Sequence, residues 1–446
     1  MRARDAFNWC YYPFHYTVPE GSYATDPDGV TRIREFRAMV AALNRAGLRV
    51  VMDVVYNHTT TSGQAPTSVL DRIVPDYYHR LDAAGRVETS TCCANTATEH
   101  AMMEKLMIDS LLTWARAYKV DGFRFDLMGH HGKDSIERAR DALQALTLEH
   151  DGVDGGAIYL YGEGWNFGEV ADDRRFVQAT QRHMGAGSGV GTFNDRLRDA
   201  VRGGAHDDRG IDHVRGQGFV NGLFHDPNAE NAGSPGERAR LLHAADLVRA
   251  GLAGNLADYV LTDRHGRAVR AAEIEYHGQA AGYASDPQET INYVAAHDNE
   301  TLFDINQYKL PVATSMDDRV RVVNLANSIV MLAHGVPFFH AGQDMLRSKS
   351  FDSNSFDSGD WFNPLDLSYA DNGWGRGLPP AWDNAANWTV AAPLLADPAL
   401  KPDAVHIRAA FAHFEELLRI RASGPLFRLR TAQAVAASLV FHNTGP

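Results

Sequence analysis

Short apolar runs alternate with longer amphipathic segments along most of the chain. Each run contains β-branched or aromatic residues and passes into Gly, Asp, Asn or His at its end, which is typical of buried strands. Six segments have this form: GLRVVMDVVYNH (47–58), KVDGFRFDLMGHH (119–131), GAIYLYGEGW (156–165), GVGTFND (189–195), ETINYVAAHDNE (289–300) and GVPFFHAGQD (335–344). We expect one strand in each segment.

The stretches between these runs have a helical period. Ahead of the first strand, one helical face carries Ile33, Phe36, Val40 and Leu43, and Gly47 is placed to cap the helix end. A second helix is expected to start at a capping box formed by Thr96 and Glu99. The apolar face of this second helix comprises Met103, Leu106, Met107, Leu111, Trp114, Ala115 and Tyr118.

This alternation predicts a parallel α/β protein. A (β/α)8 barrel is the favoured architecture, and its active site would lie at the C-terminal ends of the strands, where the polar residues gather. Two stretches interrupt the rhythm, near residues 59–95 and 201–288, and their Gly, Asp and Asn content indicates surface excursions. A doubly wound sheet is the alternative fold, but no Gly-rich phosphate loop follows any of these strands.

The composition of the chain indicates which classes of binding partner are favoured. The chain has 446 residues, is 44% hydrophobic and carries a net charge of −13, which is unfavourable for binding nucleic acid or an anionic membrane. A neutral, polar substrate fits better, and an aromatic content of 10% would suit stacking on sugars. We expect no nucleic-acid, membrane or protein partner.

The three cysteines do not form a disulfide framework. Cys10, Cys92 and Cys93 are interpreted as packing residues, with a bond between the adjacent pair as the minor alternative, and no Cys-x-x-Cys pair indicates zinc. The N-terminus shows no apolar signal core, and no apolar run approaches the length of a membrane span. The chain as given is therefore expected to be cytoplasmic, while secretion of a longer form stays open.

Carboxylates follow several of the predicted strands. Asp126 lies two residues after Arg124, so both side chains leave the strand on one face, and the guanidinium would hold the carboxylate ionised, as a nucleophile requires. Glu163 lies between glycines and close to Trp165, and packing against an aromatic ring would raise its pKa, as a general acid requires. Two carboxylates about 5 Å apart in these roles are the machinery of retaining glycoside hydrolysis.

Most of these residues also have a structural interpretation. Asp53 and Asn57 are better explained as bridges between strand and loop, and His58 and His297 are open between a core role and a binding role. The segment DSNSFDSGD (352–360) spaces oxygens like a calcium loop but lacks the Gly and Glu of an EF-hand, so no metal site is predicted and a structural calcium ion stays open. A functional role for these residues is favoured over a purely structural one, because four polar clusters occur at strand ends in one chain.

These strand ends resemble the ordered sequence regions of the α-amylase superfamily of glycoside hydrolases, through DVVYNH, GFRFDLMGHH, YGEGW and YVAAHDNE. More narrowly, STCCANTATEH, YGEGWNFGEV and KSFDSNSFDSGDWFNPLD resemble the pullulanase and limit-dextrinase branch. The resemblance covers nearly the whole chain. It implies a debranching enzyme that cuts α-1,6 linkages in pullulan, glycogen or starch-derived dextrins and requires no cofactor.

The resemblance also implies roles for individual residues. Asp126 would be the nucleophile, Glu163 the general acid/base, and Asp298 would bind sugar hydroxyls at the −1 subsite. The other substrate-binding residues would be Tyr11, His58, Arg124, Trp165, His297 and Asp360.

Tyr11 belongs to NWCYYPFHYTVPEGSY (8–23), which is similar to an aromatic loop of the family. By that similarity, Tyr11 would form a stacking platform for the −1 sugar. The family usually has Gly and Asp at the positions of Cys10 and Tyr12, and Gly supplies a backbone geometry that Cys adopts only at a cost.

The family pattern further implies a domain division. Residues 1–415 would form an α-amylase-type (β/α)8 barrel that lacks its first two strands, and residues 416–446 would begin a truncated C-terminal β-sandwich. Two alternatives stay open. One is an α-1,4-acting amylase or transglycosylase of the same superfamily, and the other is a catalytically incompetent fragment that at most binds glucan.

Overall fold

The computed structural model describes residues 9–442, so Asn8 at the start of the aromatic loop lies outside the described residues. Within this range the chain forms two compact units, which we call the N-terminal unit (residues 10–193) and the C-terminal unit (residue 9 and residues 194–442). Between residues 9 and 442, every helix is too short or too polar to cross a lipid bilayer.

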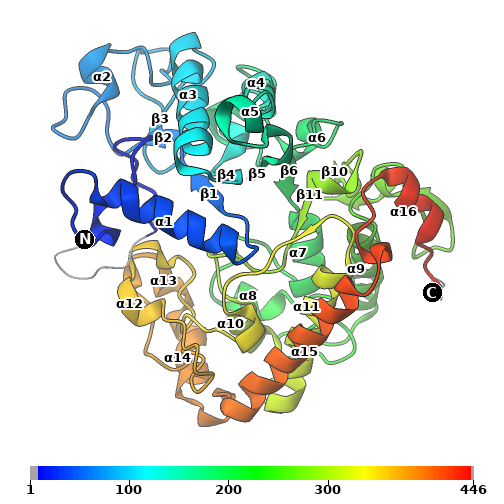
Figure 1. Ribbon diagram of the computed structural model, residues 1–446. Coiled ribbons are helices and arrows are strands. Elements are labelled where there is room, and N and C mark those ends of the chain that lie inside the picture. Colours follow the sequence, from blue (N-terminus) through cyan, green and yellow to red (C-terminus); the bar gives the residue numbers. More distant parts are fainter. Residues whose placement is uncertain (1–8, 443–446) are drawn as a thin grey trace. The chain divides into compact units, whose positions relative to one another are not determined.

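The N-terminal unit alternates strands and helices, as the sequence predicts (Figure 1). Its strands are β1 (Val51–Val54), β2 (His58–Thr59), β3 (Ala94–Asn95), β4 (Gly122–Phe125), β5 (Tyr159–Gly162) and β6 (Gly191–Phe193). Its helices are α1 (Thr31–Arg45), α2 (Leu70–Ile73), α3 (Ala101–Tyr118), α4 (Lys133–Gln144), α5 (Leu148–Asp151) and α6 (Gln181–Met184). Strands β1, β4, β5 and β6 form a parallel sheet in that order, whereas β2 and β3 pair antiparallel. All strands predicted for this part of the chain are confirmed.

Helix α3 supplies much of the core of this unit. The predicted apolar face is buried at Met103, Met107, Leu111, Trp114, Ala115 and Tyr118. The predicted capping box is wrong, because the N-cap is His100 and Glu99 instead accepts two hydrogen bonds of 2.9 Å from Arg80. At the end of α1, Gly47 has φ of 81° and closes the helix as predicted.

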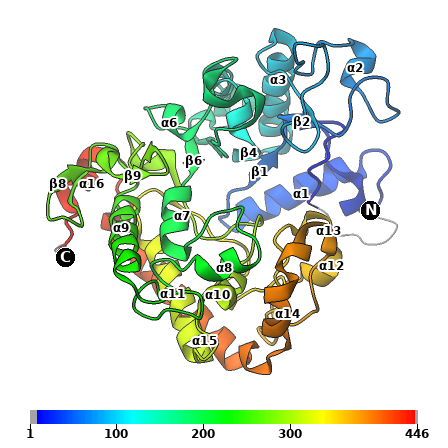
Figure 2. The same cartoon turned by 180° about the vertical axis from the view of Figure 1, so that it is seen from behind.

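The C-terminal unit contains the last two predicted strands, which are confirmed as β11 (Thr290–Asn292) and β12 (Val336–Pro337), a parallel pair. Its other strands are β7 (Val260–Thr262), β8 (Ala268–Arg270), β9 (Glu275–Tyr276) and β10 (Gln279–Ala280), which form two antiparallel hairpins. Its helices are α7 (Asp195–Arg202), α8 (Ile211–Arg215), α9 (Pro235–Leu252), α10 (Leu302–Lys309), α11 (Met316–Leu332), α12 (Gly359–Phe362), α13 (Ala381–Asn384), α14 (Trp388–Ala396), α15 (Ala404–Ala422) and α16 (Ala432–Ser438). Helix α7 lies beside α9, and α11 lies beside α15 (Figures 1 and 2).

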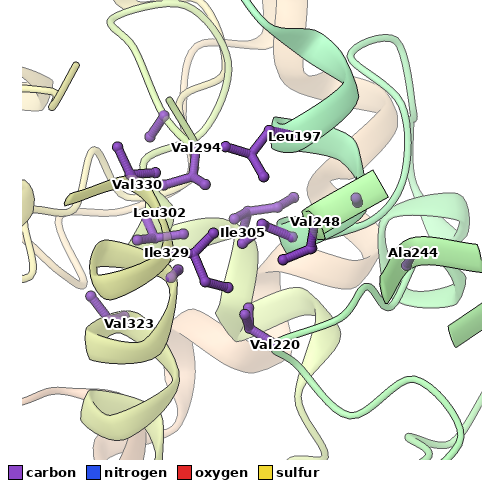
Figure 3. Close-up of a cluster of buried hydrophobic side chains, with 14 of the residues drawn as sticks. Leu197, Val220, Ala244, Val248, Val294, Leu302, Ile305, Val323, Ile329 and Val330 are labelled. Atoms are coloured by element: carbon purple, nitrogen blue, oxygen red, sulfur yellow. The ribbon is translucent and has the colours of Figure 1, made fainter. Parts of the chain in front are cut away.

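The core of the C-terminal unit corrects the interpretation of residues 201–288 as a surface excursion. Helix α9 begins at a capping box formed by Ser234 and Glu237. Figure 3 shows Ala244 and Val248 of this helix in one buried cluster with Leu302 of α10. The sequence indicated a surface segment because exposed residues such as Arg238 and Arg240 are interspersed with the apolar residues of α9.

Residues 59–95 are likewise more than a surface excursion. Leu70, Asp71, His79 and Arg80 are all buried. Asp71 accepts a hydrogen bond from the backbone N of Gly63 at 2.6 Å and lies 3.0 Å from Nδ1 of His79. Buried polar groups require partners, so the polar composition of this segment reflects an internal network.

The described part of residues 416–446 contains helices and no strand, so a β-sandwich does not begin at residue 416 as expected. Helix α15 buries Ile407, Ala410 and Leu417. Helix α16 follows, because Thr431 Oγ1 accepts a hydrogen bond from the backbone N of Ala434 at 3.2 Å and caps its start.

Candidate active site

The two candidate catalytic carboxylates follow neighbouring strands. Strands β4 and β5 run parallel with Phe125 opposite Gly162, so Asp126 and Glu163 occupy the next position on each strand. Both residues are buried. Gly162 permits this close approach, because a Cβ atom at that position would lie 2.6 Å from the carbonyl oxygen of Phe125.

A single guanidinium contacts both carboxylates. Arg124 Nη1 donates to Asp126 Oδ1 at 3.1 Å and to Asp53 Oδ1 at 2.7 Å, and Nη2 donates to Glu163 Oε1. Burial alone would lower the pKa of Arg124, but the surrounding carboxylates raise it well above its ordinary value. The side chain therefore stays cationic, and three carboxylates share one positive charge.

Trp165 contacts Glu163 through the polar edge of its ring. The indole Nε1–H donates to Glu163 Oε2 at 2.8 Å, whereas the sequence predicted apolar packing. A donor in this position stabilises negative charge on the carboxylate. The backbone of Trp165 also lies close to Gly129, where a Cβ atom would lie 2.1 Å from the Trp165 carbonyl oxygen.

A second set of contacts orients Asp126. Asn57 Nδ2 donates to Asp126 Oδ2 at 2.8 Å, and Asn57 Oδ1 lies 2.7 Å from Nδ1 of His58. The other ring nitrogen of His58, Nε2, lies 2.8 Å from the carbonyl oxygen of Tyr11. Burial lowers the pKa of His58, so the ring is neutral near pH 7. Asn57, predicted to bridge strand and loop, thus contacts the candidate nucleophile directly.

The aromatic loop reaches the same group of residues through Tyr11. The Tyr11 hydroxyl donates to Asp53 Oδ2 and accepts a hydrogen bond from Arg124 Nη1 at 3.2 Å. The preceding residue, Cys10, has φ of 64°, in the left-handed region that favours Gly. The expected glycine-type backbone at Cys10 is therefore confirmed, and Tyr12 is exposed.

Behind these residues, a buried arginine joins three segments. Arg80, which is 1% exposed, donates to Glu169 Oε1 at 2.8 Å and to the carbonyl oxygen of His130 at 3.0 Å, besides its two bonds to Glu99. Burial works to raise the pKa of Glu169, but hydrogen bonds from Ser90 and Arg80 lower it to about 2. This network fixes the chain just after Trp165. Sequence reasoning missed it, because its members lie far apart in the chain and form no local motif.

The structure places His297, Asp298 and Asp360 in the C-terminal unit. The His297 ring stacks on Trp9 with ring centroids 4.2 Å apart, and its Nε2 lies 3.7 Å from Asp298 Oδ2. Buried Lys349 donates from Nζ to the carbonyl oxygen of His297 at 2.8 Å. Asp298 and Asp360 are exposed. Their roles in sugar binding stay predictions.

The adjacent cysteines form a disulfide, the alternative that the sequence left as minor. Cys92 is exposed and Cys93 is half-buried. Cys92 Sγ lies 3.6 Å from His58 Nε2. The N-terminal unit therefore brings together Tyr11, His58, Arg124, Asp126, Glu163 and Trp165 of the predicted site, and adds Asp53, Asn57 and this disulfide to it.

Known proteins share both sequence and structure with this chain. Residues 369–446 match the family model described as alpha-1,6-glucosidases, pullulanase-type, C-terminal. The chain is 53% identical over 445 residues to pullulanase 1, chloroplastic, of Arabidopsis thaliana, and 46% identical over 444 residues to a pullulanase of Klebsiella aerogenes. These alignments cover 99% of this chain but only 46% and 39% of the two relatives, so the chain spans less than half of their length.

The structural comparison agrees with the sequence comparison. The structure of Klebsiella pneumoniae pullulanase complexed with maltotriose is 45% identical to this chain with a TM-score of 0.92, and the match covers 98% of this chain and 40% of that one. Similarity at this level extends along nearly all of the sequence. Over nearly its whole length, the chain is therefore similar in sequence and structure to pullulanases.

Proposed function

We propose that this chain carries the catalytic residues of a retaining glycoside hydrolase that cleaves α-1,6 linkages in pullulan and in branched glucans. The observation that supports this most directly is the pair Asp126 and Glu163 on the guanidinium of Arg124. Retaining enzymes need two carboxyl groups about 5–5.5 Å apart. Neighbouring strands lie about 4.8 Å apart, so equivalent positions at two strand ends offer that spacing.

In this mechanism Asp126 attacks the anomeric carbon while Glu163 protonates the leaving oxygen. The covalent glycosyl–enzyme is then hydrolysed by a water molecule that gives its proton to Glu163. Arg124 and Asn57 donate hydrogen bonds that orient Asp126 for attack. These steps use only side chains and water, and the proposal includes no cofactor.

The first step requires a proton on Glu163, which the contacts of the unliganded site oppose. Both carboxylate oxygens accept hydrogen bonds, Oε1 from Arg124 and Oε2 from Trp165. A protonated carboxyl group can still accept on both oxygens, but both contacts favour its ionised form. The proposal therefore requires that substrate binding weakens at least one of the two contacts.

The substrate class rests on the relatives and on the aromatic loop. The relatives are pullulanases, and the solved relative is complexed with maltotriose. In the proposal, Tyr11 stacks on the −1 sugar, and His58 and Trp165 contact its surroundings. The roles of His297, Asp298 and Asp360 in sugar binding rest on the family resemblance alone. The finer architecture, a (β/α)8 barrel of the α-amylase type without its first two strands, also belongs to this proposal.

The test is Asp126→Asn, which removes the nucleophile and keeps the shape of the side chain. Pullulan hydrolysis should fall by at least about a thousandfold, while binding of the glucan stays within about threefold. Asp141→Asn makes the same chemical change on the exposed face of α4 and should leave hydrolysis unchanged. The sugar released by the wild type should keep the α configuration. An inverted product would exclude the mechanism.

The product pattern separates the remaining alternatives. Cleavage of α-1,6 linkages converts pullulan to maltotriose units, whereas an α-1,4-acting amylase of the same superfamily would give other products and act readily on unbranched amylose. Transfer to an added acceptor sugar would indicate a transglycosylase. Glucan binding without any hydrolysis would indicate a catalytically incompetent fragment.

A further inference from the structure

His58, Cys92 and Cys93 form a group of side chains, called the corner below, that could bind a metal ion. The proposed hydrolysis does not use this metal-binding capacity. The imidazole comes from β2 and the two sulfur atoms from the loop before β3, and their ligand atoms all lie within 4.8 Å of one another. His58 is buried, while Cys92 is exposed, so a reductant or an ion can reach the sulfur atoms from solvent. Imidazole and thiolate are the ligand types that Zn²⁺ prefers in proteins.

The spacing between Cys92 and His58 matches a tetrahedral zinc site. Zinc bonds of about 2.3 Å to sulfur and about 2.0–2.1 Å to nitrogen, at tetrahedral angles, separate the two ligand atoms by roughly 3.6 Å. Cys92 Sγ lies 3.6 Å from His58 Nε2. Little movement of either residue is needed for both atoms to hold one ion.

The contacts around His58 also suit a metal ligand. A ligating imidazole usually donates its second N–H to a carbonyl or carboxylate oxygen, which fixes the ring and its tautomer. His58 Nδ1 lies 2.7 Å from Asn57 Oδ1, and Asn57 uses its Nδ2 to bond Asp126, so its oxygen is the atom that faces the ring. Nε2 now faces the carbonyl oxygen of Tyr11, which can only accept, so zinc binding requires the tautomer that carries its proton on Nδ1 and donates it to Asn57 Oδ1.

We propose that reduction of the Cys92–Cys93 disulfide creates a Zn²⁺ site made of His58 Nε2 and the two thiolates, and that zinc there inhibits the enzyme. A dithiol such as dithiothreitol supplies the two electrons and two protons. It ends as a cyclic disulfide, each cysteine becomes a thiol, and each thiol releases its proton to water when it binds zinc. The inhibitory part of this proposal rests on the proposed function.

Inhibition follows from the contacts that zinc would replace. Nε2 now lies 2.8 Å from the carbonyl oxygen of Tyr11, the candidate stacking residue. An Nε2 bound to zinc cannot also contact that oxygen, so the Tyr11 loop loses its link to His58. On its other side, the same ring contacts Asn57 and through it Asp126. Zinc would therefore disturb the sugar platform and the nucleophile together.

Zinc binding is tested without reference to activity. The chain is reduced with dithiothreitol, desalted without oxygen, equilibrated with zinc-buffered solution and assayed for bound zinc. We expect one zinc ion per reduced chain and none in the oxidised chain. Cys93→Ser should weaken binding by more than about tenfold, whereas Cys10→Ser, which removes the cysteine outside the pair, should not. Equal binding by oxidised and reduced wild type would overturn the site, and this comparison needs no variant to fold.

Pullulan hydrolysis then tests the consequence. Zinc should inhibit the reduced wild type, a chelator should restore its activity, and the oxidised wild type should be unaffected by the same zinc concentration. Zinc bound to the reduced chain without inhibition would overturn the regulatory role. A chain that hydrolyses no pullulan in any state would contradict the proposed function, while the binding assay still decides whether the zinc site exists.

Discussion

At the scale of single residues, variants of Cys10 can distinguish the effect of backbone geometry on stability from the effect of the side chain. Its φ of 64° lies in a region that costs a residue with a Cβ about 1–2 kcal/mol relative to the right-handed region. Cys10→Gly should remove this cost, although the freedom of Gly in the unfolded chain returns part of it. We therefore expect the free energy of unfolding, measured by urea denaturation, to rise by about 0.5–1 kcal/mol.

Cys10→Ala is the matched control for this substitution. It removes the sulfur atom but keeps the Cβ atom, so the free energy of unfolding should stay within about 0.5 kcal/mol of the wild type. If Cys10→Ala stabilised the chain as much as Cys10→Gly, the cost would lie in the thiol and not in the backbone.

His131 makes a residue-scale prediction about pH. Burial lowers the pKa of His131 to about 3 in the folded chain, whereas an unfolded histidine has a pKa of about 6.5. Between these values only the unfolded state binds the proton, so the stability present above pH 6.5 is lost as the pH falls. As the pH falls from 6.5 to 5, this histidine should therefore lower the free energy of unfolding by about 2 kcal/mol.

The measurement for His131 is the slope of the unfolding free energy against pH. His131→Gln should flatten this slope below pH 6.5 by about 1.4 kcal/mol per unit, whatever its effect on absolute stability. Above pH 7 the two curves should run parallel. A variant with the same slope as the wild type throughout would show that His131 is protonated in the folded chain.

The residues that meet at Arg124 could be predicted because parallel strands fix where their ends lie. Asp126 shares a strand face with Arg124, and Glu163 follows the neighbouring strand, so periodicity alone indicates their proximity. The contact made by Trp165 could not be predicted, because sequence spacing does not show whether a ring presents its face or its N–H. The role of Asn57 was underestimated for a similar reason, since its amide bonds Asp126 across two strand ends.

At the scale of elements, Arg80 ties residues 59–95 to the segments after β4 and β5. It is buried and bonded to Glu99, Glu169 and the carbonyl oxygen of His130. Arg80→Met should leave the buried carboxylate of Glu169 without its cation, and removing one partner of a buried ion pair costs about 3–5 kcal/mol. Chemical denaturation should show a loss of this size.

Arg86→Met is the control for Arg80 within the same segment. The Arg86 side chain is 80% exposed and pairs with Asp82 at the surface, where such pairs contribute about 0–1 kcal/mol. Its stability should therefore stay close to that of the wild type. Equal losses in the two variants would show that burial does not set the strength of these pairs.

Strands were more predictable than segment boundaries. All the apolar runs identified as strands form strands, because buried parallel strands need continuous apolar residues. The predicted capping box at Thr96 and Glu99 is wrong because Arg80, which lies outside this local motif, donates a hydrogen bond to the carboxylate of Glu99. The β-sandwich expected from residue 416 is wrong because α15 continues to Ala422 and Thr431 caps a further helix, α16. Tertiary contacts and helix caps decide where such segments begin and end, and the hydrophobic periodicity of the sequence does not show these contacts.

At the scale of the whole molecule, the proposed function implies that charge decides which glucans are accepted. The chain carries a net charge of −13, and the site groups Asp53, Asp126 and Glu163 around one arginine. A neutral glucan meets no long-range repulsion from this field, whereas an anionic glucan does. The kcat/KM for pullulan should therefore change by less than about twofold between 20 and 200 mM salt, a range in which the screening length falls from about 20 Å to about 7 Å.

Carboxymethyl pullulan tests the same argument with an anionic version of the substrate. At low salt its kcat/KM should lie at least about tenfold below that of pullulan and should recover in part as salt screens the repulsion. Hydroxypropyl pullulan at equal substitution is the steric control, because its side groups have similar bulk and no charge, so any loss it shows should not depend on salt. A strong salt dependence with unmodified pullulan, or none with the carboxymethyl form, would show that the charge around Arg124 does not select the substrate.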